Sequence, residues 1–315
     1  MPERKQTPSL KVQIGSLNLQ NPVITASGTF GYGEEFRDFV DFSRLGGLVT
    51  KGVSLEERAG NPPPRIVETA AGMLNAIGLQ NVGYERFVSE KMPFLREARA
   101  QGCAVIVNVY GSRLKDYVEL ARRFDGLDGI DAIELNVSCP NVSEGGVVFG
   151  KDPEVLRRLV HAVRAATTKD VWVKLTPDVA DVTVFARIAE EEGAEAVSAI
   201  NTFRGMAVDL DTRRPVLTNT FGGLSGPAIK PLALARVFEI AQAGDLSIPV
   251  IGVGGIMDGR DALEFLLCGA RAVQVGTANF VDPSAGSRIA CEIEAWLVEQ
   301  GIPDVNDVIG TIERP

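Results

Sequence analysis

The sequence has little of what several common kinds of function require. Its 315 residues include one histidine and four cysteines, and the net charge is −9. No two cysteines form a C-x-x-C pair, which disfavours a disulfide framework, a zinc knot or an iron–sulfur cluster held by this chain alone. The acidic balance argues against a nucleic-acid or anionic-membrane surface. His161 lies in an amphipathic helical pattern and is predicted to be a helix-surface residue, so proton chemistry must come from other groups.

Apolar runs of transmembrane length are missing too, and the first ten residues are polar without an apolar signal core. We therefore expect a cytoplasmic protein without a membrane contact. With 45% hydrophobic and 23% charged residues, the chain can bury a large core. Because no linker, charge block or low-complexity tract divides it, residues 1–315 are predicted to form a single domain.

Eight short apolar runs recur along the chain with helical patterns between them. This alternation favours parallel strands buried on both faces, and eight such units predict a closed (β/α)8 (TIM) barrel. The predicted strands are Val23–Ser27, Gly47–Lys51, Val105–Val109, Ala132–Val137, Val171–Leu175, Ala196–Asn201, Val250–Val253 and Ala272–Val275. The predicted helices are Glu85–Ala100, Leu114–Phe124, Pro153–Ala166, Val182–Glu192, Pro231–Ala243, Gly259–Cys268 and Ser284–Glu299.

Three further features are expected around this barrel. Residues 12–19 predict an N-terminal β-hairpin around a Gly-Ser turn, which could plug the bottom of the barrel. Residues 61–81 and 203–226, after strands 2 and 6, are predicted to be long loops on the catalytic face, and a glycine-rich loop follows strand 4.

Cys139 follows the fourth strand, where Pro140 ends the ladder because it has no N–H to donate. A lone cysteine at such a place is commonly a small buried hydrophobe. Here Asn136, Ser138 and Asn141 flank it, and a strand end seldom carries so many polar groups without a ligand to satisfy them. We therefore interpret Cys139 as a candidate reactive thiol at the catalytic face.

The other strand ends present cations, amides and glycines. Lys51 and Lys174 follow apolar strand residues and are expected to pair with ligand anions; the alternative is a core carboxylate such as Glu134. The amides of Asn75, Asn136 and Asn201 could hydrogen-bond a planar ligand, or serve as turn formers and caps.

Glycine pairs end the last two strands, where barrels commonly bind a phosphate on main-chain N–H groups. These are Gly254-Gly255 after strand 7 and Gly276-Thr277 after strand 8, and the cluster that ends at Gly226 could add donors. Tight strand-to-helix turns are the alternative reason for glycine at these positions. Two clusters at neighbouring strands favour the phosphate.

Five stretches together resemble class 1 dihydroorotate dehydrogenases. They are ETAAGMLNAIGLQN (68–81), NVSCPN (136–141), INT (200–202), GVGGI (252–256) and QVGTA (274–278), and their order and spacing cover nearly the whole chain. The resemblance implies an FMN-containing barrel that oxidises dihydroorotate to orotate in pyrimidine biosynthesis.

The resemblance also implies a role for individual residues. Cys139 would be the catalytic base that removes the C5 proton, while FMN accepts the C6 hydride. FMN would be bound by Ser27, Thr50, Lys51, Asn108, Asn136, Lys174, Ile200, Gly226, Gly254, Gly255, Gly276 and Thr277. The substrate would be bound by Lys51, Asn75, Ala76, Ile77, Gly78, Leu79, Asn136, Asn201 and Thr202. No metal is expected on this chain.

The loop MLNAIGLQN is more similar to the NAD-linked B type than to the fumarate-using, homodimeric A type. The B type implies a partner subunit with FAD and a [2Fe–2S] cluster, in a heterotetramer built on a homodimer of this chain. Three alternatives remain open. They are the A type, a related FMN barrel such as a dihydropyrimidine dehydrogenase, and a flavin subunit that only relays electrons.

Overall fold

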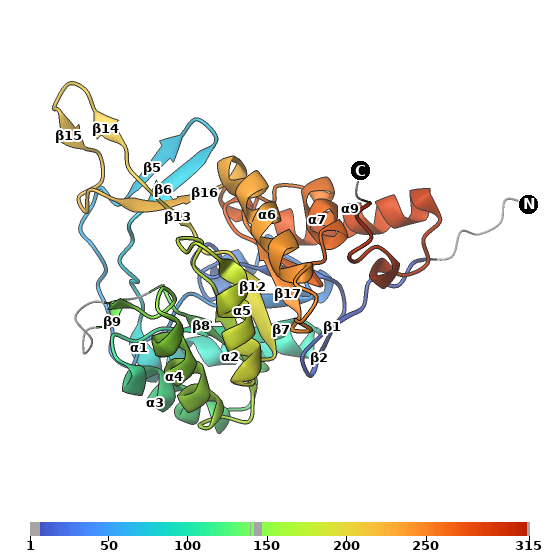
Figure 1. Cartoon of the computed structure of the whole chain (residues 1–315), viewed down its shortest axis with the longest axis horizontal. Coiled ribbons are helices and arrows are strands. Elements are labelled where there is room, and N and C mark those ends of the chain that lie inside the picture. Colours follow the sequence, from blue (N-terminus) through green and yellow to red (C-terminus); the bar gives the residue numbers. More distant parts are fainter. Residues whose placement is uncertain (1–6, 139, 142–146, 314–315) are drawn as a thin grey trace, which may run out of the picture.

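The computed structural model describes residues 7–138, 140–141 and 147–313. At its centre is a closed barrel of eight parallel strands, each paired with the next along the chain, which confirms the predicted fold (Figure 1). The strands are β3 (Val23–Thr25), β4 (Gly47–Val49), β7 (Ala104–Val109), β8 (Ala132–Asn136), β11 (Asp170–Lys174), β12 (Ala196–Ala199), β17 (Val250–Val253) and β18 (Ala272–Val275).

Five strands end one or two residues earlier than their apolar runs predict. β8 ends at Asn136 rather than Val137, β11 at Lys174 rather than Leu175, and β12 at Ala199 rather than Asn201. β3 ends at Thr25 rather than Ser27, and β4 ends at Val49 rather than Lys51. Past β4 the N–H of Thr50 still donates to the carbonyl of Ile106 in β7, whereas the N–H of Lys51 donates to the carbonyl of Gly31 in a loop at 2.6 Å. Ser27 lies in a turn after β3, and Lys51 lies in a bend after β4.

Helices cover the outside of the barrel (Figure 1). Asp152, Asp181 and Asp258 begin three of them, and each carboxylate accepts main-chain N–H bonds from the first turn. The predicted helix at residues 85–100 begins at Gly83 and contains one π-helical turn, η3 (Phe87–Lys91). The α-helices are α1 (Gly83–Arg86), α2 (Met92–Ala100), α3 (Leu114–Asp125), α4 (Pro153–Arg164), α5 (Val182–Glu191), α6 (Lys230–Ala241), α7 (Gly259–Leu267), α8 (Ala278–Val281) and α9 (Ala285–Gln300).

The apolar core lies around the barrel strands. Large side chains of α3, β11 and α7, namely Phe124, Trp172 and Phe265, are fully buried in it. None of the helices in the described ranges is long and apolar enough to cross a membrane. The structure also contains short 3-10 turns. The turns are η1 (Glu34–Phe36), η2 (Phe42–Arg44), η5 (Pro227–Ile229) and η6 (Val305–Asp307).

The N-terminal hairpin forms as predicted from β1 (Val12–Ile14) and β2 (Leu17–Leu19). At its turn, the main-chain N–H and the hydroxyl of Ser16 donate to the carboxylate of Asp170 at 2.8 and 2.7 Å. Asp170 is the first residue of β11, so the hairpin lies at the amino-terminal end of the barrel. We call this end the amino face.

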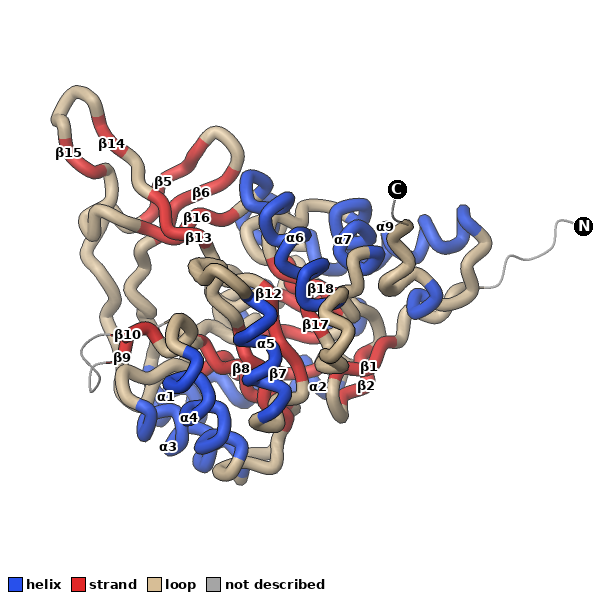
Figure 2. Tube along the Cα trace, in the orientation of Figure 1, coloured by secondary structure: helices blue, strands red, loops and turns tan. Residues whose placement is uncertain are grey.

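The two long segments predicted to be loops contain strands instead. β5 (Ile66–Thr69) and β6 (Gly72–Asn75) come from the first, and β13 (Phe203–Gly205) and β16 (Gly222–Ser225) come from the second. Together they form a four-stranded antiparallel sheet in the order β13-β16-β6-β5, set apart from the barrel (Figure 2). A small hairpin, β14 (Val208–Asp209) and β15 (Arg214–Pro215), extends from it, and β9 (Pro140–Asn141) pairs with β10 (Val147–Val148).

Candidate active site

The residues predicted to bind ligands lie at the end of the barrel opposite the hairpin, where all eight strands reach their carboxyl ends. We call this end the carboxyl face. Asn108, Asn136 and Lys174 occupy one of the last two positions of β7, β8 and β11. Ten others follow a barrel strand within three positions: Ser27, Thr50, Lys51, Ile200, Asn201, Thr202, Gly254, Gly255, Gly276 and Thr277. The remaining six, Asn75, Ala76, Ile77, Gly78, Leu79 and Gly226, end or follow strands of the four-stranded sheet. Because parallel strands end on the same side, the fold brings these residues together.

A buried ion pair lies in the barrel at this face. The ammonium of Lys174 donates to the hydroxyl of Ser27 at 3.1 Å and to Oε1 of Gln274 at 3.5 Å. It also lies 4.0 Å from Oε1 of Glu134, whose side chain is fully buried. The sequence left two kinds of partner open for Lys174, a ligand anion or a core carboxylate such as Glu134. In the structure Lys174 lies beside Glu134, and it also bonds to Ser27 of the predicted cofactor site.

Two polar residues of this site were not predicted. Gln274 lies in β18 and Ser198 lies in β12, each in a strand whose positions are all buried. Both donate to Oε2 of Glu134, Gln274 at 2.6 Å and Ser198 at 2.8 Å. The signal was available, because a polar residue inside an otherwise apolar strand must find a partner within the barrel.

Amide side chains from distant parts of the chain meet at the carboxyl face. The amide nitrogen of Asn201 donates to Oγ of Ser138 at 2.9 Å and to Oδ1 of Asn136 at 3.4 Å. Asn75 lies in the four-stranded sheet, where it pairs with Gly223 and donates to the carbonyl of Gly223 at 3.3 Å. A Cβ at Gly223 would overlap the side chain of Thr202, so glycine permits this close approach.

The loop at residues 76–79 is held through its main-chain carbonyls. Asn61 bonds to the carbonyls of Ala76 and Ile77, and Nε of Arg58 donates to that of Gly78 at 3.1 Å. The hydroxyl of Tyr110 and the amide of Asn81 both donate to the carbonyl of Leu79, at 3.1 and 3.0 Å. Within the described part of the chain, the N–H groups of residues 77–79 have no acceptor. The loop therefore presents donors to a ligand.

A second group of free donors lies at the glycines. Among residues 7–138, 140–141 and 147–313, nothing accepts a hydrogen bond from the N–H groups of Gly254, Gly255, Gly276 and Thr277, and all four residues are partly exposed. A Cβ at Gly255 would lie 2.8 Å from the main-chain nitrogen of Lys230, so this turn requires glycine. Such a set of N–H groups suits a phosphate.

The chain near Gly226 adjoins these donors. Thr277 Oγ1 donates to Oγ of Ser225 at 2.9 Å, and Gly226 follows Ser225 with a φ of 93°. Ile200 is buried beside them, and its N–H donates to the carbonyl of Val253 at 3.0 Å. The residues predicted to bind the cofactor after strands 6, 7 and 8 are thus brought together.

Lys51 is a half-buried cation on the same face. Burial lowers its pKa, the Arg65 guanidinium lowers it further, and Glu35 acts in the opposite direction. No carboxylate within the described ranges lies in ion-pair distance of its ammonium. A ligand anion would restore the lost stabilisation of this charge.

Cys139, the predicted base, lies outside the described residues. The neighbouring Ser138 is described, and its hydroxyl accepts the bond from Asn201 noted above. His161 is on the surface of α4, where Nδ1 lies 2.9 Å from Oε2 of Glu192. This confirms the predicted surface position of the histidine.

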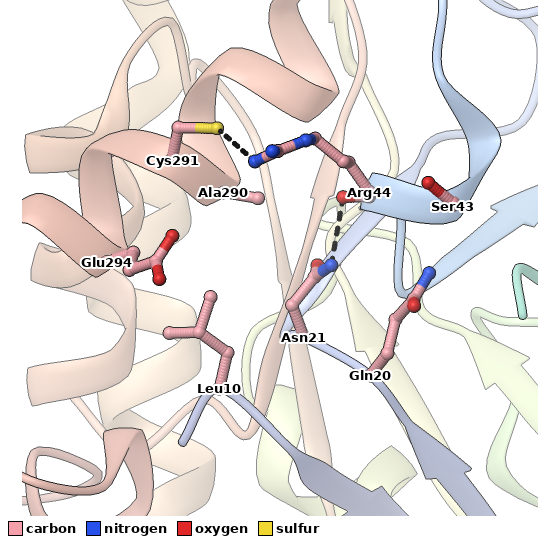
Figure 3. A pocket seen from close by; sticks show the side chains of 8 residues that line it. All are labelled: Leu10, Gln20, Asn21, Ser43, Arg44, Ala290, Cys291 and Glu294. Carbon is pink, nitrogen blue, oxygen red and sulfur yellow. Dashed lines mark hydrogen bonds between the residues drawn. The ribbon is translucent and has the colours of Figure 1, made fainter. Parts of the chain in front are cut away.

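A cavity at the amino face holds none of the predicted residues (Figure 3). In it, a guanidinium nitrogen of Arg44 donates to the exposed thiol of Cys291 at 3.2 Å. The lining residues are Leu10, Gln20, Asn21, Ser43, Arg44, Ala290, Cys291 and Glu294. Gln20 and Asn21 precede β3, and Ser43 and Arg44 precede β4, which places the cavity at the opposite end from the converging amides.

Comparisons with known proteins agree with this geometry. The family model described as dihydroorotate dehydrogenase matches residues 9–297. A relative from Geobacter sulfurreducens is 56% identical over 308 residues, 98% of this chain and 99% of its own. Another, from Trichlorobacter lovleyi, is 56% identical over 306 residues, 97% of this chain and 99% of its own. Both are named the catalytic subunit of dihydroorotate dehydrogenase B (NAD(+)).

A solved structure supports the fold. The crystal structure of an Eimeria tenella dihydroorotate dehydrogenase in complex with ferulenol has a TM-score of 0.79. It is 24% identical, and the match covers 100% of this chain and 91% of that one.

The fold and the comparisons define a barrel enzyme, and its polar side chains converge at the carboxyl ends of the barrel strands. Within that class, the chain belongs to the dihydroorotate dehydrogenase family. This membership confirms the predicted activity, oxidation of dihydroorotate in pyrimidine biosynthesis, and the predicted resemblance to the NAD-linked B type.

Proposed function

We propose that this chain binds FMN and dihydroorotate together on the carboxyl face and passes the electrons to a separate subunit. The relatives' name, catalytic subunit of an NAD(+) enzyme, supports such a division of labour. The partner would carry FAD and a [2Fe–2S] cluster and reduce NAD, in a heterotetramer built on a homodimer of this chain. The observation that carries the proposal is at this one face: a set of N–H groups and the ammonium of Lys51 that have no partner among the described residues.

The cofactor fits the residues present. The four free N–H groups at Gly254, Gly255, Gly276 and Thr277 would hold its phosphate. Lys174 would supply a fixed positive charge beside the ring system. When bound, FMN accepts a hydride from the substrate.

The substrate fits the other half of the face. Dihydroorotate is a six-membered ring with amide groups and a carboxylate, so it needs hydrogen-bond donors and acceptors as well as a cation. The cluster of Asn75, Asn136 and Asn201 offers the amides, and the N–H groups of residues 77–79 offer donors for an anion. Lys51 would meet the carboxylate, and Thr202, next to Asn201, would complete the pocket.

Cys139 would remove the proton from the substrate. A thiol acts as a base through its thiolate, and its ordinary pKa of about 8.5 means that cations or donors must assist it near neutral pH. What supports the assignment is its place in the chain, one residue after Ser138, which is bonded to the amide cluster. No histidine is available there, since the only one is on the surface of α4.

Replacing the thiol tests this assignment. The purified chain, loaded with FMN, is mixed anaerobically with dihydroorotate, and flavin reduction is followed by absorbance. For Cys139→Ser we expect a rate about 10²–10⁴-fold lower near neutral pH, the usual contribution of a positioned base. Cys291→Ser changes an exposed cysteine at the amino face and is the matched control, with no change expected. Equal rates for both variants would contradict the role of Cys139.

The same experiment separates the alternatives. A subunit that only relays electrons would show no flavin reduction by dihydroorotate, and a dihydropyrimidine dehydrogenase would respond to dihydrouracil instead. Copurification from native cells tests the partner: we expect a second subunit, with iron–sulfur absorption beyond that of flavin, and NAD reduction only in its presence. A chain that purifies alone and reduces fumarate would overturn the B-type assembly.

A further inference from the structure

Glu134 is the most buried charged residue of the site, and the proposed reaction gives it no role. It lies in β8, its side chain has no exposed surface, and its two oxygens accept three hydrogen bonds. The donors are Asn108 Nδ2 at 2.7 Å, Ser198 Oγ at 2.8 Å and Gln274 Nε2 at 2.6 Å. These come from β7, β12 and β18, so one carboxylate ties together strands from opposite parts of the barrel.

The carboxylate decides which way its neighbours point. Because an ionised carboxylate only accepts, both amides must turn their nitrogens toward Glu134. Asn108 therefore directs its oxygen away from Glu134, and Gln274 directs its Oε1 toward the ammonium of Lys174 at 3.5 Å. A single acidic group thus sets the orientation of two amides in the predicted cofactor site.

Glu134 also balances the charge of Lys174. The ammonium lies 4.0 Å from Oε1, and the two side chains are 6% and 0% exposed. Burying a cation without a counterion would cost folding free energy, whereas Lys174 and Glu134 together carry no net charge. The negative charge of Glu134 therefore reduces the electrostatic potential that Lys174 exerts on a ligand bound next to it.

We infer that Glu134 is a positioning residue that fixes Lys174 and, through its negative charge, lowers the reduction potential of the bound flavin. The inference rests on the proposed binding of FMN beside Lys174. A reduced flavin carries more negative charge than an oxidised one, so positive charge nearby favours reduction and negative charge opposes it. Loss of the Glu134 charge raises the potential, and loss of the Lys174 charge lowers it.

Glu134→Gln separates charge from shape. The variant keeps the side chain's size and one acceptor oxygen, and Asn108 can rotate its amide to bond with the new NH₂ group. What it removes is the negative charge. Ser198→Ala is the matched control, since it removes one of the three donors and changes no charge.

The readout is the midpoint potential of FMN bound to the purified chain, from anaerobic titration against reference dyes. At a fixed potential we expect Glu134→Gln to raise the ratio of reduced to oxidised flavin about tenfold, or about 30 mV for two electrons. Ser198→Ala leaves the potential at the wild-type value, although it lowers the melting temperature. A Glu134→Gln potential equal to that of the wild type would overturn the inference, even if the variant were less stable.

A second pair of variants tests the effect of the Glu134 charge on the flavin potential without leaving Lys174 as a buried cation that lacks its counterion. If Glu134→Gln does not fold, Lys174→Gln is compared with the double variant Glu134→Gln/Lys174→Gln. We expect the double variant to have the higher potential, because only the Glu134 charge differs between the two, and equal values would overturn the inference. A wild-type chain that takes up no FMN would instead overturn the proposed function on which it rests.

Discussion

The two ends of this barrel carry similar side chains, and they differ in whether the chain itself satisfies them. At the amino face, buried Asn21 accepts from the N–H groups of Val23 and Gly46 and donates to the carbonyl of Arg44. The carboxylate of Asp170 likewise accepts hydrogen bonds from the main-chain N–H and the hydroxyl of Ser16 in the hairpin. At the carboxyl face, the N–H groups of residues 77–79 and of the glycine turns have no acceptor among the residues described.

The same contrast holds for the charged groups. Each face has a cation, Arg44 at the amino face and Lys51 at the carboxyl face. Arg44 is exposed and reaches Cys291 and Asp41, whereas Lys51 is half-buried with a lowered pKa. The residue types alone therefore do not distinguish a ligand site from a structural one. What distinguishes the carboxyl face is a set of N–H donors without acceptors and a half-buried cation at the ends of the barrel strands.

The largest expected effect of breaking this contrast is at Asn201. Asn201→Ala removes the amide that joins Asn136 and Ser138. We expect kcat/KM for dihydroorotate to fall about 100-fold, since a hydrogen bond to a charged ligand contributes about 1.5–3 kcal/mol. Steady-state kinetics measures the loss. A melting temperature close to that of the wild type is expected alongside it, and a stability loss with intact kinetics would reverse the interpretation.

The matched change at the amino face is Asn21→Ala. It leaves the N–H of Val23 and the carbonyl of Arg44 without their buried partner, while the N–H of Gly46 keeps its bond to the carbonyl of Val23. We therefore expect the free energy of unfolding to fall by about 2 kcal/mol. Chemical denaturation of the purified chain gives this value. The folded variant should keep its kcat/KM, and a catalytic defect without destabilisation would show that the two faces are not separated in this way.

Lys51 provides a pH test of the same contrast. Because burial lowers its pKa below the ordinary 10.5, the ammonium loses its proton at a lower pH than a free lysine does. We expect kcat/KM to fall as the pH rises through this lowered pKa, since the anionic substrate loses its cation. Lys51→Arg should keep activity to higher pH, because a guanidinium stays protonated. Arg44→Met, at the amino face, should leave the pH profile unchanged, and a profile unaltered by Lys51→Arg would exclude Lys51 as the titrating group.

The smallest expected effect concerns Tyr110, which acts through the loop rather than on the ligand. Tyr110→Phe removes the hydroxyl that donates to the carbonyl of Leu79 and accepts from Asn81. Loss of one such bond costs about 1 kcal/mol, so we expect KM for dihydroorotate to rise about fivefold with little change in kcat. Unchanged KM would show that the loop holds its shape without this contact.

Much of this arrangement follows from local pattern. Short apolar runs alternating with amphipathic helices determine a closed parallel barrel, and a polar residue at the end of such a run or just after it lies at the carboxyl face. For this reason Asn108, Asn136 and Lys174 could be assigned to the site from their positions alone. The motifs around Cys139 and the glycines carry the resemblance to the family, and the family model matches the range that contains them, residues 9–297.

The pairings between distant segments were decided only in three dimensions. The strands Gly72–Asn75 and Gly222–Ser225 are short and glycine-containing, without the alternation that marks a strand, so they were predicted to be loops. They form a sheet because each supplies edge N–H and carbonyl groups to the other across 148 positions, as Asn75 does with Gly223. The contacts of Glu134 with Ser198 and Gln274 likewise needed the closed barrel, since barrel closure alone brings β8, β12 and β18 around one carboxylate.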